Sequence, residues 1–170
     1  KELGGFQLES GSIRLKNYSY IPDLKYYNEG YWWVQDVSAS IPVKIIENEI
    51  KDKNFLDLCA APGGKTASLI SKGARVTAIE KNSQRIEILK ENLKRLNFKA
   101  EIILADATKW SPNKKFDGVL LDAPCSSTGI IRKNPDILFR NHINLSSLIL
   151  LQKKLLFSGI EMLNKGGILI

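Results

Sequence analysis

The chain has 170 residues, with 25 Lys and Arg against 18 Asp and Glu, which gives a formal net charge of +7. Its 44% hydrophobic and 25% charged content is that of a folded protein and excludes a disordered or fibrous chain. The length suits one domain with a sizeable core, and no apolar run approaches the roughly 20 residues that a membrane helix needs. The positive charge suits an anionic partner such as RNA but does not require one.

The cysteine and histidine content limits the chemistry that this chain offers. Cys59 and Cys125 are too few for a disulfide scaffold or for a zinc site built on cysteine pairs, so we expect no metal and a reducing, cytoplasmic location. His142 is the only histidine and has no motif around it. A Ser-His-Asp triad is therefore set aside.

The two ends of the chain indicate a piece of a longer protein, with a trimmed or poorly ordered tail as the alternative. The chain begins at Lys1, and residues 166–170 are typical of a turn followed by the start of a buried strand. We therefore expect a domain that is incomplete at its C-terminus.

Two regions are predicted along the chain. Residues 1–30 form a lead-in, in which apolar residues alternate around Ser10-Gly11-Ser12 as in a β-hairpin. Residues 31–170 form the main domain, which opens with a helical pattern over 36–49, where Pro42 is expected in the first turn.

Strands then alternate with helices. Glu91 and Arg95 on the second helix are predicted to form an i,i+4 pair. This alternation predicts an α/β fold, a mainly parallel sheet with helices on both faces. The predicted strands are 54–58, 75–79, 101–104, 118–121 and one that opens at Ile168, and the predicted helices are one that ends near Lys72, one capped by Ser83, and 144–163.

Ligands of an open parallel sheet bind beyond the carboxyl ends of its strands, near the point where the strand order reverses. Each predicted strand end carries polar or small residues that hydrophobic patterning alone would not require. These residues are Cys59, Ala60, Ala61, Pro62, Gly63, Gly64 and Lys65 after the first strand, Glu80 after the second, Asp106 after the third and Asp122 to Cys125 after the fourth.

The first of these turns is neither of two common phosphate-binding loops. A P-loop needs a glycine where this chain has Cys59, and the dinucleotide fingerprint needs spaced glycines where Gly63 and Gly64 are adjacent. What remains is a small-residue loop that lets a ligand lie against the backbone. Glu80 is a candidate acceptor for both hydroxyls of a ribose, with a solvated strand end as the alternative.

Cys125 lies on a proline-containing loop and is a candidate nucleophile or proton-transfer partner, with an inert thiol as the alternative. Cys59 is nearer to that alternative. Arg132 and Lys133 suit phosphate contacts or simple solvation equally well. Trp32 and Trp33 are candidates for stacking on a base, but packing against the sheet is favoured.

Several motifs make the chain resemble the RNA (cytosine-5) methyltransferases, and within them the bacterial 16S rRNA enzymes of the Sun/Fmu type. The resemblance covers nearly everything from about residue 30 onward. Its motifs are VQDVSAS at 34–40, LDLCAAPGGKT at 56–66, the acids Glu80 and Asp106, LLDAPCSSTGIIRKNPD at 120–136 and the closing KGGILI.

The resemblance implies a Rossmann-like, S-adenosylmethionine-dependent methyltransferase. It implies that the 59–65 loop holds the methionine end of the cofactor, Glu80 the ribose and Asp106 the adenine. Asp122 would then lie close to both the methionine portion and the target base.

The resemblance also implies a mechanism in which a cysteine thiolate adds to carbon 6 of a flipped-out cytosine, so that carbon 5 can accept the methyl group. In the family, the nucleophile lies in a Thr-Cys-Ser motif just after the strand that opens at Ile168, beyond these 170 residues. Cys125 is then expected to assist breakdown of the covalent intermediate, together with Asp122 in the catalytic site. Ser127 departs from the Gly or Ala that relatives often have, without evident consequence.

The resemblance leaves the RNA substrate open. Methylation of 16S rRNA is the leading expectation, with the same chemistry on tRNA as an alternative. A cofactor-binding relic or a non-catalytic RNA-binding module is a further alternative. A small-molecule methyltransferase is disfavoured, because the Pro-Cys loop has no use in simple transfer to oxygen or nitrogen. The family's upstream RNA-binding helical domain is also missing, which bears on the RNA affinity of this piece. We expect a monomer that binds RNA, with no membrane segment.

Overall fold

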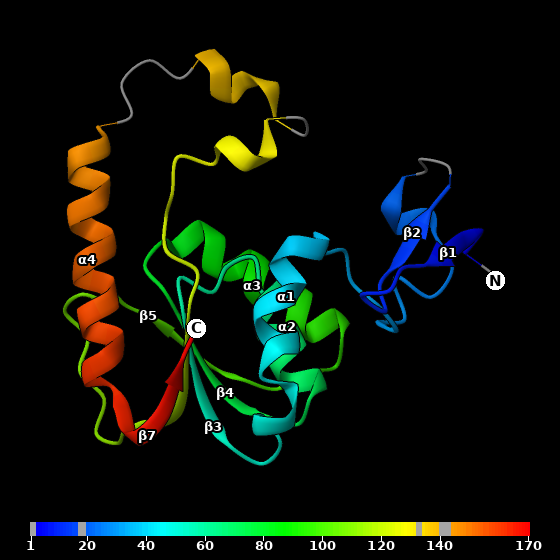
Figure 1. Cartoon of the computed structure of the whole chain (residues 1–170). Coiled ribbons are helices and arrows are strands. Elements are labelled where there is room, and N and C mark those ends of the chain that lie inside the picture. The colour runs from blue at the N-terminus through cyan, green and yellow to red at the C-terminus, as the bar shows by residue number, and fades with distance from the viewer. Residues whose placement is uncertain (1–2, 17–19, 132–133, 140–143) are drawn as a thin grey trace.

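The computed structural model describes residues 3–16, 20–131, 134–139 and 144–170 (Figure 1). The first two strands, β1 (Gly5–Gln7) and β2 (Ile13–Leu15), pair antiparallel with Phe6 opposite Arg14. The predicted hairpin is therefore confirmed. It lies apart from the main sheet, to one side of the molecule (Figure 1).

The main sheet has five parallel strands in the order β5-β4-β3-β6-β7. The order reverses between β3 and β6, so the switch point lies beyond the carboxyl ends of these two strands. Both are rich in buried apolar residues, as a strand covered on two faces requires. The strands are β3 (Asn54–Leu58), β4 (Arg75–Glu80), β5 (Glu101–Leu104), β6 (Phe116–Leu121) and β7 (Leu163–Leu169).

Helices cover both faces of this sheet, as predicted. Phe55 packs toward α1 and α2 on one face, whereas Leu56 and Leu58 pack toward α4 on the other. Because successive strand residues point to opposite faces, β3 contributes to both cores. The helices are α1 (Val37–Ile45), α2 (Gly64–Ser71) and α3 (Ser83–Arg95) on the first face and α4 (Leu145–Glu161) on the second, with short 3-10 turns at Ile21–Asp23, Glu47–Glu49, Thr128–Ile130 and Pro135–Phe139.

Three details of the predicted elements were wrong. Asn82, not Ser83, caps α3, because its side chain accepts hydrogen bonds from the Gln84 and Arg85 amides. Pro42 lies inside α1 beyond its first turn, where a proline removes one backbone donor and its ring crowds the carbonyl of Ser38 four residues earlier. Strand β7 begins at Leu163 rather than Ile168, because Leu163 already pairs with Phe116 and the residues that follow form an irregularity in the strand.

The segment before α1 packs onto α3 through Arg95. The Arg95 guanidinium donates hydrogen bonds to the carbonyls of Tyr27 (2.6 Å) and Trp32 (3.1 Å) and lies 3.8 Å above the Tyr27 ring. The predicted pair between Glu91 and Arg95 is therefore wrong, because tertiary contacts engage the arginine. The Trp33 ring meets Phe98 edge-on, which supports packing rather than stacking on a base.

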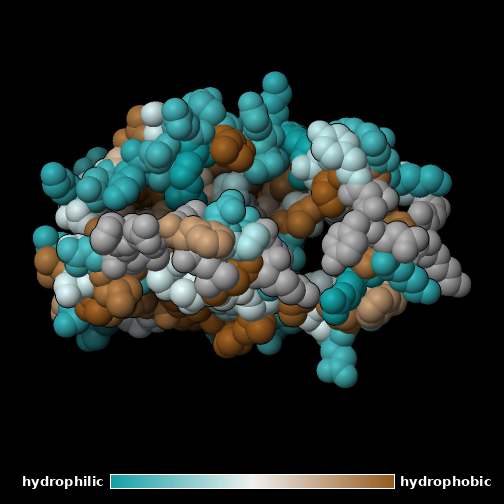
Figure 2. All heavy atoms as spheres, turned by 90° about the horizontal axis from the view of Figure 1, so that it is seen from above, coloured by the Kyte–Doolittle hydropathy of each residue, from teal (hydrophilic) through white to brown (hydrophobic). Residues whose placement is uncertain are grey.

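The surface mixes hydrophilic and hydrophobic side chains (Figure 2). A groove of about 380 Å³ runs between the hairpin and residues 31–35, and Figure 2 shows the molecule hollowed beside the hairpin. Helix α4 exposes Leu145, Ile149 and Ile160 on its outer side. Within the described ranges, no helix is long and apolar enough to cross a membrane.

Asp117 joins the amino ends of three strands, and its removal is expected to destabilise the fold. Its carboxylate accepts a hydrogen bond from the Asn54 amide (2.9 Å) on β3 and one from the Asn164 side chain (3.0 Å) on β7. Hydrogen bonds to a charged group contribute about 1.5–3 kcal/mol each, but the Asn164 bond is exposed to solvent and the Asn54 bond only partly buried. We therefore expect Asp117→Ala to lower the free energy of unfolding by about 2 kcal/mol at pH 7.

The effect of Asp117→Ala has a defined pH dependence. The hydrogen bond from the Asn54 amide lowers the pKa of Asp117, with the Asn164 side chain as a further cause. A lowered pKa in the folded state stabilises at neutral pH, and this stabilisation is lost as the pH falls through the folded-state pKa. Urea unfolding should therefore separate wild type and variant at pH 7, and the difference should shrink steadily as the pH is lowered below about 4. Equal free energies at pH 7 would contradict this role.

Candidate active site

The turn that follows β3 brings its backbone to the switch point of the sheet. Cys59 and Gly63 both have left-handed backbone conformations, with φ of 62° and 102°. At Gly63 a Cβ atom would lie 2.6 Å from Leu89 of α3, so both the conformation and the space require glycine. The turn is thus drawn tightly into the start of α2.

Side chains of helix α3 hold this turn by donating hydrogen bonds to carbonyl groups of the turn. The Arg85 guanidinium donates a hydrogen bond to the Ala61 carbonyl, and the Asn92 side chain donates one to the Pro62 carbonyl at 2.8 Å. Within the turn, the Gly63 amide bonds to the Ala60 carbonyl at 2.8 Å. Helix α3 and a backbone bond within the turn therefore position the predicted cofactor loop.

Glu80 ends β4 next to this turn and is only 3% exposed. Its Oε1 atom accepts a hydrogen bond from the Asn82 amide at 3.0 Å. Its Oε2 atom has no hydrogen-bond partner, although the Arg85 guanidinium lies 3.5 Å away with ion-pair but not hydrogen-bond geometry. A buried carboxylate oxygen without a donor is available to accept a hydrogen bond from a hydroxyl group of a ligand.

Asp106 lies beyond β5, beside a small and largely apolar pocket. The hydroxyl and amide of Thr108 both donate to its Oδ1 atom, at 2.7 and 2.9 Å, and these two bonds lower the pKa of Asp106. The pocket reaches from the end of β4 to α4. Its apolar lining includes Ile79, Ala107, Pro124, Leu151 and Leu155.

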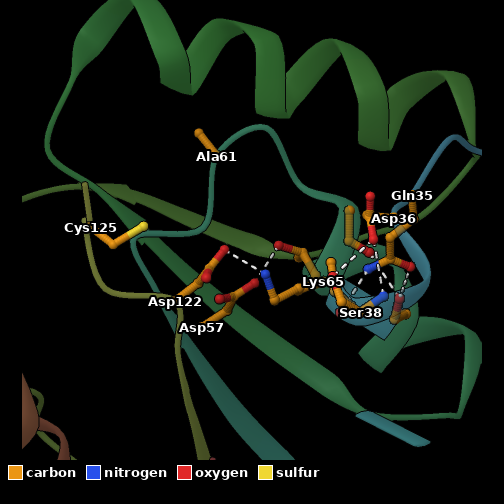
Figure 3. A network of polar contacts seen from close by, with 12 residues as sticks. Gln35, Asp36, Ser38, Asp57, Ala61, Lys65, Asp122 and Cys125 are labelled. Carbon is orange, nitrogen blue, oxygen red and sulfur yellow. Dashed lines mark hydrogen bonds and ion pairs between the residues drawn. The ribbon is translucent and has the colours of Figure 1, made fainter. Parts of the chain in front are cut away.

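Lys65 and Asp122 form the polar centre of the site. The Lys65 amine lies 2.6 Å from Asp122 Oδ2, which joins the first turn of α2 to the loop after β6. Figure 3 shows the amine of Lys65 directed toward the carboxylates of Asp122 and Asp57. The carboxyl ends of β3 and β6 are thereby linked across the switch point.

The two cysteines have different surroundings. Cys125 is exposed on the loop after Asp122, and its sulfur accepts a hydrogen bond from the Ser127 amide at 3.3 Å. Cys59 is half-buried, and burial, followed by the charge of Glu80, raises the pKa of its thiol to about 11. Cys59 is therefore a protonated thiol at neutral pH and a poor nucleophile.

Sequence reasoning missed Asp57 and Arg85. Asp57 lies within the apolar strand β3 and is fully buried. An acidic residue in an otherwise apolar strand could have identified it, but the hydrophobic periodicity alone does not. Arg85 contacts both the Ala61 carbonyl and the Glu80 carboxylate, and no local sequence pattern predicts these contacts.

Not every residue singled out in the sequence is described by the structure. Arg132, Lys133 and His142 fall outside the described residues. Among the residues that the structure describes, no three His, Cys, Asp or Glu side chains are grouped as metal ligands. The remaining predicted residues, from the 59–65 turn to Cys125, converge on one end of the sheet.

Comparison with known proteins identifies the family. Residues 44–170 match the family model of 16S rRNA methyltransferase RsmB/F. The chain belongs to this family. It is 41% identical over 150 residues to ribosomal RNA small subunit methyltransferase B of Photorhabdus laumondii, covering 85% of the chain and 35% of that relative. The corresponding protein of Klebsiella pneumoniae is 39% identical over 165 residues, covering 94% of the chain and 38% of the relative.

A solved structure supports the same assignment. The crystal structure of NSun6 from Pyrococcus horikoshii with SFG, an analogue of S-adenosylmethionine, matches with a TM-score of 0.78 and 28% identity. The match covers 89% of this chain and 40% of that one. The Rossmann-like methyltransferase fold is thus confirmed, and the chain spans little more than a third of the length of the curated relatives named above.

The family's cofactor is S-adenosylmethionine, and the residues present fit it. Glu80 offers a buried oxygen without a donor, and an apolar pocket lies beside Cys59, Ile79 and Asp106 at the strand ends. The excess of carboxylates over lysines at the strand ends suits a ligand that carries a sulfonium cation.

Proposed function

We propose that this chain is the catalytic region of an RNA methyltransferase that methylates carbon 5 of a cytosine in 16S rRNA. The observation that carries the proposal is the position of Cys125, exposed on the loop that follows Asp122. A thiol at this place has no use in simple methyl transfer to oxygen or nitrogen. It has a use where a covalent bond between enzyme and base must be broken.

The chain's own residues divide the work of holding the cofactor. The 59–65 turn, which α3 fixes, would hold the methionine end, and Glu80 would accept the ribose hydroxyls at its free oxygen. The adenine ring would lie near Asp106, at the mouth of the small apolar pocket beside it. When bound, the cofactor supplies an electrophilic methyl group. Asp122, held by Lys65, would face both the methionine portion and the target base.

The target cytosine needs covalent activation because its carbon 5 is a poor nucleophile. A cysteine thiolate forms a bond to carbon 6, and carbon 5 then takes the methyl group as the methyl–sulfonium bond breaks and a neutral thioether leaves. A base finally removes the carbon-5 proton as the bond between carbon 6 and the cysteine sulfur breaks. Cys59 is unsuited to the attack because of its raised pKa. We assign the attack to a cysteine beyond residue 170 and the release of product to Cys125.

The names of the relatives and the charge of the chain support the proposed RNA substrate. The curated relatives are rRNA methyltransferases by name, and the net charge of +7 suits an RNA partner. We propose that Arg132 and Lys133 contact RNA phosphates. We further propose that the protein acts as a monomer in the cytoplasm.

Cys125→Ala tests the proposed function. In the protein that carries this chain together with the attacking cysteine, the variant should methylate the base but fail to release it. A covalent protein–RNA adduct should accumulate on denaturing gels. Ser126→Ala, one residue along the same loop, should turn over without an adduct. Absence of a trapped adduct from Cys125→Ala would contradict the assignment.

Bisulfite sequencing of RNA from a strain that lacks the gene, and from one that carries it, identifies the substrate. Deletion of the gene should remove one 5-methylcytosine from 16S rRNA, and the wild-type gene should restore it. Loss of a tRNA methylation instead would favour the tRNA alternative. Unchanged methylation of both RNAs would favour a non-catalytic protein.

A further inference from the structure

A buried carboxyl group lies beneath the candidate site with one oxygen unpaired. Asp57, near the carboxyl end of β3, is 0% exposed. Its Oδ2 atom accepts a hydrogen bond from the Thr66 hydroxyl at 2.6 Å, whereas its Oδ1 atom has no partner. An ionised carboxylate in this position would be costly, because a buried charge needs more than one neutral donor.

The charged groups around Asp57 would not neutralise a negative charge on its carboxyl group. Asp122 from the β6 loop and Glu80 from β4 add two further acids. On α2, Lys65 is already paired with Asp122 at 2.6 Å, and Arg85 of α3 lies beside Glu80. The turn after β3 adds only the Cys59 thiol, which is neutral at pH 7. The site therefore holds more acids than cations.

These surroundings change the acid strength of Asp57. The pKa of Asp57 is raised to about 7, chiefly by burial, with the negative charges of Asp122 and Glu80 acting in the same direction. The Thr66 hydroxyl and Lys65 oppose this rise. A cation that enters the site would favour the ionised form. S-adenosylmethionine brings such a cation, because its sulfonium and ammonium groups outnumber its carboxylate.

We propose that Asp57 is a positioning residue that carries a proton while the site is empty and releases it when S-adenosylmethionine binds. The O–H bond of the carboxyl group breaks, the proton passes to the solvent, and the carboxylate left behind stabilises the cationic ligand through space. Asp57 is buried, so it acts through Thr66, Lys65 and its charge rather than by contact. The proposal rests on the cofactor site described above.

Proton release is measured by calorimetry of S-adenosylmethionine binding in buffers of different ionisation enthalpy. At pH 6, a group with a pKa of about 7 is about 90% protonated, so we expect release of about 0.9 proton per ligand bound. The number should fall toward zero at pH 8.5. S-adenosylhomocysteine, which lacks the sulfonium charge, should release fewer protons.

Variants separate this role from a structural one. Asp57→Asn keeps the shape and the acceptor for Thr66 and should abolish proton release at pH 6 while circular dichroism remains unchanged. Thr66→Val removes the hydroxyl that favours the ionised form, so its release profile should shift to higher pH, and Thr66→Ser should restore it. A purely structural hydrogen bond would not move this profile.

Two results would overturn the proposal, and they are distinguishable. If wild type binds S-adenosylmethionine without releasing protons, or Asp57→Asn releases as many as wild type, the proton linkage is wrong while the cofactor site stands. If wild type shows no binding heat in any buffer and no protection against thermal unfolding, the cofactor site itself is wrong.

Discussion

Gly118→Ala is expected to lower the free energy of unfolding by about 3 kcal/mol, at the upper end of the cost of overpacking a core. Gly118 in β6 lies directly opposite Phe55 in β3. A Cβ atom at this position would lie 2.1 Å from Phe55 Cε1 and 2.4 Å from Cζ. The Phe55 ring is 0% exposed and packed beneath α1 and α2, so it has nowhere to move.

Urea unfolding followed by tryptophan fluorescence measures this effect. Gly129→Ala is a suitable control, because a Cβ atom there would meet nothing within 4 Å. Combining Gly118→Ala with Phe55→Leu should recover part of the lost stability, since the smaller side chain frees the space that the new methyl group needs. Equal stability of Gly118→Ala and wild type would mean that the strands can move apart to admit the methyl group. This result would contradict the tight packing of Phe55 against Gly118.

Glu80→Gln is expected to weaken S-adenosylmethionine binding about 100-fold. Hydrogen bonds to a charged acceptor contribute about 1.5–3 kcal/mol each, and loss of about 3 kcal/mol corresponds to roughly two orders of magnitude in affinity. Glutamine keeps the oxygen that accepts from Asn82 but replaces the carboxylate by a neutral amide. It therefore changes the ribose contact without removing the local turn.

Calorimetry measures the change in affinity, and thermal unfolding verifies that the variant is folded. Glu87→Gln is the matched control, because Glu87 lies on α3, is exposed and pairs with Lys90 at 2.8 Å, away from the strand ends. This control removes the same charge and should leave the affinity unchanged. An unaltered affinity for Glu80→Gln would exclude the proposed ribose contact.

Most of the site could be predicted from the sequence because it is built from strand ends. A parallel sheet places the carboxyl ends of its strands at one edge, so Glu80, Asp106 and Asp122 converge once the strands are recognised. The Lys65–Asp122 ion pair could not be predicted in this way, because its partners come from elements that only the pairing of β3 with β6 brings together.

Local patterns failed where a long-range contact outweighed them. The spacing of Glu91 and Arg95 predicted a surface pair, but the arginine instead holds the carbonyls of Tyr27 and Trp32. Exposed i,i+4 pairs stabilise by only about 0.3–0.5 kcal/mol, so two charge-assisted bonds and a contact with an aromatic ring easily exceed them. Strand β7 likewise began earlier than its apolar residues suggested, because pairing with β6 extends it.

The sequence by itself determined the α/β alternation, the strand ends that carry polar residues and the motifs of the RsmB/F family, because periodicity and short motifs are local properties. Only the tertiary structure decided that Asp57 is buried with an unpaired oxygen, that Arg85 spans the turn and Glu80, and that Gly118 makes room for Phe55. Burial and electrostatic environment depend on neighbours distant in the chain, and these neighbours exist only once the sheet and its helices have packed.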